Sequence, residues 1–273
     1  MRLGDAPESG NFEDRTGQSG GGMNLGGGLF GMLIPFVISR FGIVGILILG
    51  LGYCALSSLG GGGLLSGGGT ATNGESRLTA EQRRVLIGTL VSTEKVWGDI
   101  FRQEGQAYAP TRMVAYTSGT QSGCGAAQAA MGPFYCPTDQ RIYIDPRFFD
   151  ELTRRFGAPG DFAQAYVVAH EVGHHVQDLN GTLGTSNSNQ QQVAVELQAD
   201  CYAGVWAARS GGLEAGDIEE GMRAAEAIGD DTLQRKTQGA VIPESFTHGT
   251  SAQRIAALRN GLNSGNPSAC NLT

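Results

Sequence analysis

The stretch HEVGHH, residues 170–175, contains three of the four histidines in this chain of 273 residues. It lies within DFAQAYVVAHEVGHHVQDLNG, residues 161–181, where apolar residues recur at helical spacing. His170 and His174 are four residues apart, so on a helix they share one face, one turn apart. Two imidazoles so placed can bind one metal ion, and Glu171 projects beside them. The stretch therefore predicts a metal site carried by a helix.

The next helical segment offers the missing ligand. A catalytic zinc ion ordinarily has three protein ligands and a fourth position open to water. In ELQAD, Glu196 and Asp200 are again four apart, and the preceding loop is long enough to set the two helices side by side. We predict that Glu196 is the third ligand. We expect Asp200 to accept a hydrogen bond from the other nitrogen of a ligand histidine; the alternative is two solvated acids on a helix surface.

Glu171 has a different predicted role. In an HExxH arrangement the glutamate does not bind the metal but takes a proton from the attacking water. His175 is rotated off the ligand face of the same helix, so we expect it to support the site from behind or to be exposed. The sequence thus predicts zinc, one ion per chain, held by His170, His174 and Glu196.

Composition argues against a nucleic-acid-binding protein. The formal net charge is −7 at pH 7, and the 19 Lys and Arg residues are scattered along the chain rather than clustered. A protein that binds phosphate backbones needs clustered cations to displace counterions. We therefore expect no nucleic acid partner.

One segment of the chain has the composition of a membrane helix. Residues 41–59, FGIVGILILGLGYCALSSL, carry no charge, and about 20 apolar residues suffice to cross a hydrocarbon core of about 30 Å. We predict a transmembrane helix there, within a hydrophobic segment at 29–59; a buried core helix is the alternative. Arg2, Arg15 and Arg40 precede it, which places the N-terminus in the cytoplasm. The lipid bilayer would be a partner, and the rest of the chain would face outward.

The remaining segments divide by composition. Residues 1–28 are polar, acidic and glycine-rich, and are expected to form a disordered cytoplasmic tail. Residues 60–76, GGGGLLSGGGTATNGES, read as a flexible linker. Residues 77–273 would form the functional domain.

The cysteines of this domain are Cys124, Cys136, Cys201 and Cys270, which suit an oxidising compartment. They permit three pairings, of which we expect 124–136 and 201–270. Metal binding by cysteines is the rival interpretation, but the chain has no CxxC pair.

Within the domain, strands come first and helices follow. Thr79 and Gln82 form a capping-box pattern before a helix at 80–104. Short strands are expected at 112–118, 132–136 and 141–145. Helical patterns follow from Pro146 onward and end with SAQRIAALRNGL, for which Ser251 is expected to be the cap. This order predicts an α+β domain.

At this point the motifs resemble a known family. HEVGH with ELQAD is similar to the gluzincin arrangement of thermolysin-type metallopeptidases. A wider set resembles the bacterial family named "Putative neutral zinc metallopeptidase" over residues 77–270 and in its single N-terminal anchor: Cys124-Gly125, GPFYCPTDQRIYID, AHEVGHHVQ, ELQADCYAGVW and THGTSAQR. The resemblance implies a zincin-like domain, a small sheet with an antiparallel edge plus helices, after one transmembrane helix. It also implies a single-pass protein of the bacterial inner (cytoplasmic) membrane, with its catalytic domain facing the periplasm or the cell exterior.

The resemblance also suggests how a substrate is bound. Gly132, Phe134 and Tyr135 would form the sheet edge along which a peptide lies antiparallel, although the two aromatic rings could equally pack the sheet. His248 lies in THGTSAQRI, which is similar to the THPxxxxRI segment of membrane-bound zinc endopeptidases, with Gly249 in place of the proline. By that likeness His248 would stabilise the oxyanion; a structural role is the alternative.

We therefore predict a membrane-anchored zinc peptidase that acts on a peptide or protein substrate. A metal-activated water would attack the scissile bond with Glu171 as general base. A zinc-stabilised, membrane-tethered binding or quality-control scaffold with vestigial activity is the alternative from another class. A domain without any metal would require four ligand-type residues to fall at these places by chance.

Overall fold

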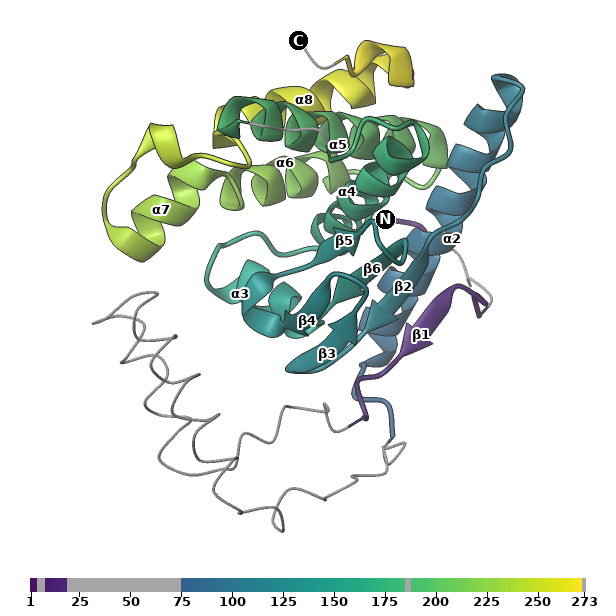
Figure 1. The fold of residues 1–273 in the computed structure, drawn as a ribbon, viewed down its shortest axis with the longest axis horizontal. Coiled ribbons are helices and arrows are strands. Elements are labelled where there is room, and N and C mark those ends of the chain that lie inside the picture. Colours follow the sequence, from purple (N-terminus) through teal and green to yellow (C-terminus); the bar gives the residue numbers. More distant parts are fainter. Residues whose placement is uncertain (4–7, 19–74, 185–187, 272–273) are drawn as a thin grey trace, which may run out of the picture. The chain divides into compact units, whose positions relative to one another are not determined.

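Helix α4 (Asp161–Leu179) carries the HEVGHH stretch and lies at the centre of the computed structural model, which describes residues 1–3, 8–18, 75–184 and 188–271 (Figure 1). From Phe162 to Gln177 nearly every residue of α4 is buried. A helix that is covered all round must be packed by several elements. The helix ends at Asn180 and Gly181, whose φ of +69° suits a residue without a Cβ.

Helices cover one side of α4. The helix α5 (Asn189–Ser210) and the helix α6 (Asp217–Ala227) both pack on α4, and α8 (Ser251–Ser264) packs on α5 and α6. The helix α2 (Ala80–Gln103), which begins at the predicted Thr79 capping box, also contacts α4 and α5. Figure 1 shows α4 between α5 and α6 on one side and the strands β5 and β6 on the other, with α2 running along the sheet. Two shorter helices, α3 (Arg147–Arg154) and α7 (Asp230–Gln238), flank this arrangement.

A four-stranded sheet lies on the other side of α4. Its order is β1 (Phe12–Asp14), β2 (Arg112–Ala115), β6 (Arg141–Ile144) and β5 (Phe134–Cys136). The pairs β1–β2 and β2–β6 are parallel, whereas β5 and β6 pair antiparallel, with Tyr135 opposite Ile142. The strand β5 is therefore an edge of this sheet, and it contacts α4.

The two faces of the sheet have different coverings because side chains alternate along each strand. Met113, Ala115, Ile142 and Ile144 point into the main core with residues of α2 and α4. Val114, Tyr116 and Tyr143 point the other way, into a smaller cluster with Ala127. Ala127 belongs to the hairpin β3 (Gly119–Ser122) and β4 (Gly125–Gln128), which covers that face.

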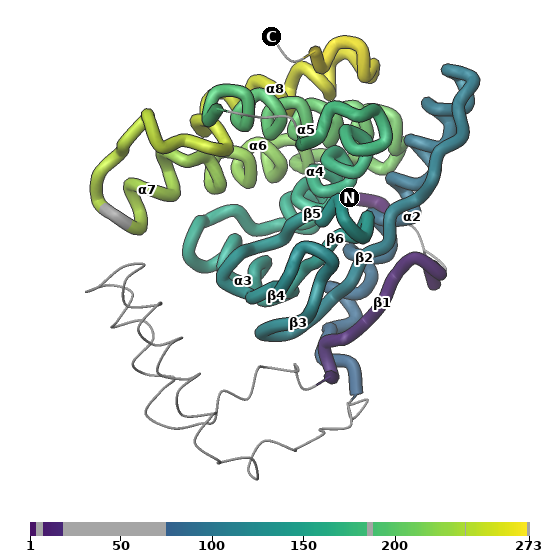
Figure 2. Tube along the Cα trace, in the orientation of Figure 1, coloured from purple at the N-terminus to yellow at the C-terminus, as the bar shows by residue number. Residues whose placement is uncertain are grey.

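The described N-terminal residues pack into the same compact unit, which comprises Met1–Gly20 and Gly74–Thr273. Figure 2 shows β1 running beside β2. In their register Phe12 pairs with Met113. The backbone N–H of Arg2 donates to the Gly212 carbonyl at 2.8 Å. A Cβ at Gly88 in α2 would lie 2.8 Å from the Cβ of Leu3, so this glycine leaves room for the N-terminal residues. The prediction of a disordered tail at 1–28 is therefore wrong for residues 1–3 and 8–18.

The membrane part of the predicted fold is also corrected. Among the described residues, no helix combines the length and the apolarity that crossing a bilayer requires. The predicted segments 29–59 and 41–59, with the linker as far as residue 74, lie outside those residues. Strand β1 precedes 41–59 in the sequence and β2 follows it, yet the two strands pair. A single crossing between them would put them on opposite sides of a bilayer, so the predicted single-pass inner-membrane location is wrong.

The disulfides and three of the strands match the sequence patterns. The observed architecture is α+β, and both expected disulfides, Cys124–Cys136 and Cys201–Cys270, are confirmed. The strands at 112–118, 132–136 and 141–145 are present in shorter form as β2, β5 and β6. The sequence patterns missed β1, the β3–β4 hairpin and α7, which are short and mostly polar.

The close contact of α5 with α8 gives the first prediction. A Cβ at Gly261 would overlap the carbonyl oxygen of Cys201, so Gly261→Ala should push α8 away from α5. Overpacking costs about 1–3 kcal/mol, and about 2–4 °C of Tm is lost per kcal/mol in a domain of this size. Thermal unfolding followed by circular dichroism measures the loss.

The matched control is Gly98→Ala in α2, where an added Cβ meets open space. Because alanine is the better helix former, this variant should keep or slightly raise the Tm. Equal Tm values for the two variants would contradict the described α5–α8 contact.

Candidate metal centre

The two HExxH histidines lie one turn apart on α4, and their rings meet edge to face with centroids 4.7 Å apart. Both are buried among the helices. Glycine between them lets α5 approach, because a Cβ at Gly173 would lie 3.0 Å from the Cα of Ala199. Gly173 thus allows the ELQAD segment of α5 to pack directly against the two histidines.

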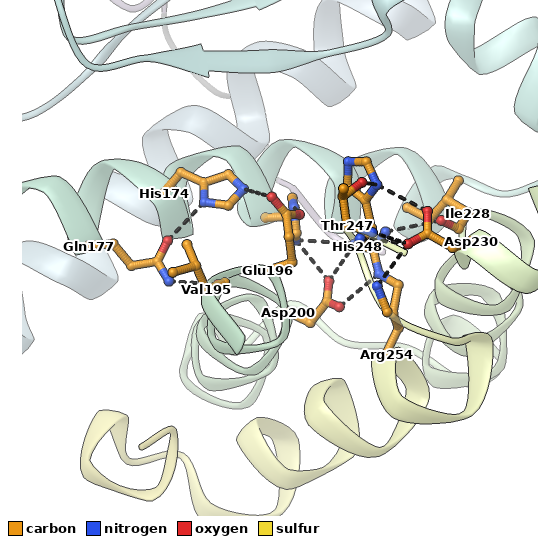
Figure 3. Close-up of polar contacts among 12 residues, drawn as sticks. His174, Gln177, Val195, Glu196, Asp200, Ile228, Asp230, Thr247, His248 and Arg254 are labelled. Carbon is orange, nitrogen blue, oxygen red and sulfur yellow. Dashed lines mark hydrogen bonds and ion pairs between the residues drawn. The ribbon is translucent and has the colours of Figure 1, made fainter. Parts of the chain in front are cut away.

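Glu196 of α5 faces both imidazoles. Its Oε2 lies 3.2 Å from His170 Nε2, and its Oε1 lies 3.5 Å from His174 Nε2. Figure 3 shows the Glu196 carboxylate pointing toward the His174 ring. One ligand atom from each of the three residues falls within 4.8 Å of the others. The structure therefore brings together the three residues that the sequence predicted as ligands.

The donor set fits a zinc ion. The remaining ring nitrogens are occupied, since Nδ1 of His170 contacts Asp200 and Nδ1 of His174 contacts Gln177, each at 2.8 Å. Both Nε2 atoms are therefore free to face the same point. Tetrahedral bonds of about 2.0–2.1 Å put neighbouring ligand atoms about 3.3 Å apart. Each histidine Nε2 lies near this spacing from one of the two Glu196 oxygens, at 3.2 Å from Oε2 for His170 and at 3.5 Å from Oε1 for His174.

Asp200 joins three helices behind this centre. It is fully buried, accepts from His170 Nδ1 and Tyr166 Oη of α4, and pairs with Arg254 of α8 through two contacts of 2.8 Å. Burial alone would raise the pKa of Asp200, but Arg254 and His170 outweigh it and lower that pKa to about 2. The carboxylate is thus ionised and holds the His170 ring in one orientation. Figure 3 shows Asp200 facing Arg254.

Arg254 had no assigned role in the sequence. The cap of α8 is Thr250 and not the predicted Ser251, because the Thr250 side chain and Gln253 form the capping box. This start places Arg254 in the first turn of α8. The guanidinium is buried and lines the same groove as the histidines. The signal that could have pointed to it is the motif THGTSAQRI, in which Arg254 occupies the place of the arginine in THPxxxxRI.

Glu171 lies beside the three candidate ligands and also lines the groove. It is buried, and burial raises the pKa of its carboxyl, with Glu196 acting in the same direction and the two histidines opposing them. A carboxylate whose pKa is raised is a stronger base than an ordinary one, which suits it to accept and return a proton.

His248 lines the same groove, and Asp230 of α7 organises its loop. One oxygen of Asp230 accepts from the backbone N–H groups of Thr247, His248 and Gly249, at 2.7, 2.7 and 3.1 Å. The other oxygen lies 3.2 Å from His248 Nδ1, as Figure 3 shows. Gly249 has a φ of +87°, which proline cannot adopt, so the glycine in this THG segment is required by its backbone.

The groove has a volume of about 880 Å³ and runs between α4 and the sheet edge. Gly132, Phe134 and Tyr135 line it together with the candidate ligands. Phe134 also stacks on Tyr143, and the Tyr135 hydroxyl donates to Asp178 and contacts His175 Nδ1. The aromatic side chains thus pack the sheet, while the edge strand that carries them faces the groove. His175 is buried and joins this edge to α4.

A second group of acids could hold a cation. Asp161, Asp217 and Glu220 lie close together, but the α-ammonium group of Met1 contacts Asp161 at 2.9 Å and Asp217 at 3.1 Å. Arg84 contacts Asp161 as well. The Met1 ammonium and Arg84 already neutralise these acids, so the group does not need a metal ion.

Comparisons with known proteins agree with the motifs. The family model described as "Putative neutral zinc metallopeptidase" matches residues 1–273. The "Uncharacterized protein YpfJ" of Escherichia coli (strain K12) is 41% identical over 294 residues, which cover 99% of this chain and 98% of that protein. The "Uncharacterized protein Rv2575" of Mycobacterium tuberculosis (strain ATCC 25618 / H37Rv) is 40% identical over 204 residues, 68% of each chain. No solved structure matches the chain.

The metal-free protein should lose stability as the pH rises. Burial lowers the pKa of His170, but Asp200 and Glu196 outweigh it and raise that pKa from 6.5 to about 10. A group whose pKa is raised by folding stabilises the folded state fully at pH values below its unfolded pKa. This stabilisation is lost as the pH rises through its folded pKa. Between pH 6.5 and 10, the free energy of unfolding of chelator-treated protein should therefore fall.

Urea titrations at several pH values measure this fall, and His170→Gln is the comparison because it removes the titrating group. The wild-type protein should lose more stability over this range than the variant does. Titrating groups that do not contact His170 contribute equally to both proteins. Identical pH dependence in the two proteins would contradict the raised pKa of His170.

Proposed function

Because the chain belongs to the Putative neutral zinc metallopeptidase family, we propose that it hydrolyses peptide bonds in the groove between α4 and β5. The observation that carries the proposal is the convergence of His170, His174 and Glu196 on one point, with Glu171 beside them. Three ligands and a neighbouring carboxylate at the floor of an open groove are what metal-dependent hydrolysis requires.

One zinc ion per chain would be held by Nε2 of His170, Nε2 of His174 and the carboxylate of Glu196. When bound, the ion would lower the pKa of a water molecule and polarise the scissile carbonyl. Asp200 and Gln177 hold the two imidazoles in the orientation that binding needs.

Glu171 is the proposed general base. Its carboxylate accepts a proton as water attacks the scissile carbon, and then passes this proton to the leaving amine. Burial supports this role in two ways. It raises the pKa of the carboxyl, and it keeps bulk water from competing with the substrate for the carboxylate.

His248 is the proposed donor to the carbonyl oxygen that becomes negatively charged. Asp230 lies 3.2 Å from Nδ1, so Nε2 is the ring nitrogen left to face the substrate. The three backbone N–H groups held by Asp230 fix the loop, so the ring is carried by a rigid turn although its side chain is 49% exposed.

A peptide would bind by adding a strand to the sheet. The edge strand β5 is antiparallel to β6, and its residues line the groove that holds the candidate ligands. Pairing with the backbone of Gly132 to Tyr135 would hold an extended peptide with little regard for its sequence. An unfolded polypeptide is therefore the appropriate test substrate.

Replacing the proposed base gives the decisive activity test. Glu171→Gln removes the proton acceptor without removing a metal ligand, so zinc content should stay at one ion per chain. Cleavage of an unfolded polypeptide such as casein should fall by about 10²–10⁴-fold. Glu219→Gln, an exposed position on α6, is the matched control and should behave as wild type.

Full activity in Glu171→Gln would contradict the proposed mechanism. Zinc binding without any cleavage by the wild-type protein would instead favour a zinc-stabilised binding scaffold.

Replacing the proposed oxyanion donor should affect kcat more than KM. His248→Ala is expected to lower kcat by about 10²–10³-fold, the usual effect of losing one such donor, with zinc content unchanged. Asp230→Asn should lower kcat less, because it weakens the support of His248 but leaves the imidazole in place. Steady-state kinetics on a fluorogenic peptide measures both. An unchanged kcat in His248→Ala would assign this histidine a structural role.

A further inference from the structure

A chain of buried amides leads from His174 to the C-terminal segment. His174 Nδ1 lies 2.8 Å from Gln177 Oε1, and Gln177 Nε2 donates to the Val195 carbonyl at 2.7 Å and to Gln198 Oε1 at 2.9 Å. Gln198 Nε2 then donates to the Cys270 carbonyl at 2.9 Å. Figure 3 shows the first part of this chain, with Gln177 between His174 and Val195.

The direction of each hydrogen bond is determined by the backbone. The Val195 and Cys270 carbonyls can only accept, so the amide nitrogens of Gln177 and Gln198 must face them. The oxygen of Gln177 is thereby turned toward His174, whose Nδ1 must carry the proton and donate it. This leaves the lone pair on Nε2, the nitrogen that faces Glu196. The chain of amides therefore selects the tautomer that a metal ion needs.

The far end of the chain is held by a disulfide. Cys270 is bonded to Cys201, which lies on α5 one turn after Gln198. Gln177 is completely buried, and Gln198, Cys201 and Cys270 are each less than 10% exposed. Water cannot readily replace a lost partner at this depth, so a break at one position leaves an amide unpaired and free to turn.

The two candidate ligands are thus supported differently. His170 is held by the charged Asp200, which Arg254 neutralises, whereas His174 depends on neutral amides that end at a backbone carbonyl. We propose that the disulfide-held C-terminal segment positions His174 for metal binding through Gln198 and Gln177. This inference rests on the proposed metal site. Gln177, Gln198 and the Cys201–Cys270 disulfide are then positioning groups.

Zinc affinity, measured by competition with a chromophoric chelator at fixed pH, tests the proposal. Gln177→Leu should weaken zinc binding by about 10–100-fold, the usual effect of losing a group that orients a ligand. Gln177→Glu should weaken it less, because a carboxylate still accepts from His174 Nδ1. Gln198→Leu and the double variant Cys201→Ser/Cys270→Ser should weaken binding in the same direction, although neither touches a ligand.

The matched control is Gln106→Leu, which replaces an exposed glutamine outside this chain of amides and should leave zinc affinity unchanged. Circular dichroism establishes that each variant is folded; if the Cys201→Ser/Cys270→Ser protein does not fold, Gln198→Leu, which keeps the disulfide, decides. A lower Tm with unchanged zinc affinity in Gln198→Leu would overturn the proposal and leave the amides a purely structural role. Failure of the wild-type protein to bind zinc would instead contradict the proposed function itself.

Discussion

The buried carboxylate of Asp200 is the interaction on which the arrangement of the site depends. A carboxylate with no exposed surface must be neutralised, and here Arg254, His170 and Tyr166 supply the partners. Removing one partner of a buried ion pair typically costs about 3–5 kcal/mol, because the remaining charge stays buried. Any movement that separates α4, α5 and α8 would break these contacts and would carry the same cost. The helices that carry the candidate ligands are therefore held together by the same group that orients a ligand.

The residues of α4 have two roles, packing the core and lining the groove. Apolar residues such as Val168 and Val172 join the core, while His170, Glu171 and His174 line the groove. Close packing at Gly173 brings Glu196 within reach, and the edge strand β5 lies on the other side of the groove. Tyr135 and His175 connect that edge to α4, so the proposed peptide-binding edge and the candidate metal centre are parts of one rigid frame.

Helical periodicity explains what could be predicted. Residues four apart share a face, so HEVGH and ELQAD were sufficient to indicate His170, His174, Glu196 and Asp200 as neighbours once two helices were expected to pack together. Gln177, Asp230 and Arg254 could not be found this way, because their roles depend on contacts between segments distant in sequence or on amide orientation. The predicted disulfides agree with the structure. The single-pass topology was wrong because hydropathy considers one segment at a time, whereas the pairing of β1 with β2 joins residues on either side of that segment.

The central claim is that His170, His174 and Glu196 hold one zinc ion. Anomalous scattering at the zinc edge, from crystals of the zinc-loaded protein, tests it most directly. The account predicts one peak per chain, about 2.0–2.2 Å from Nε2 of each histidine and from a Glu196 oxygen. A peak elsewhere in the chain, or an ion held by the two histidines with Glu196 turned away, would contradict it.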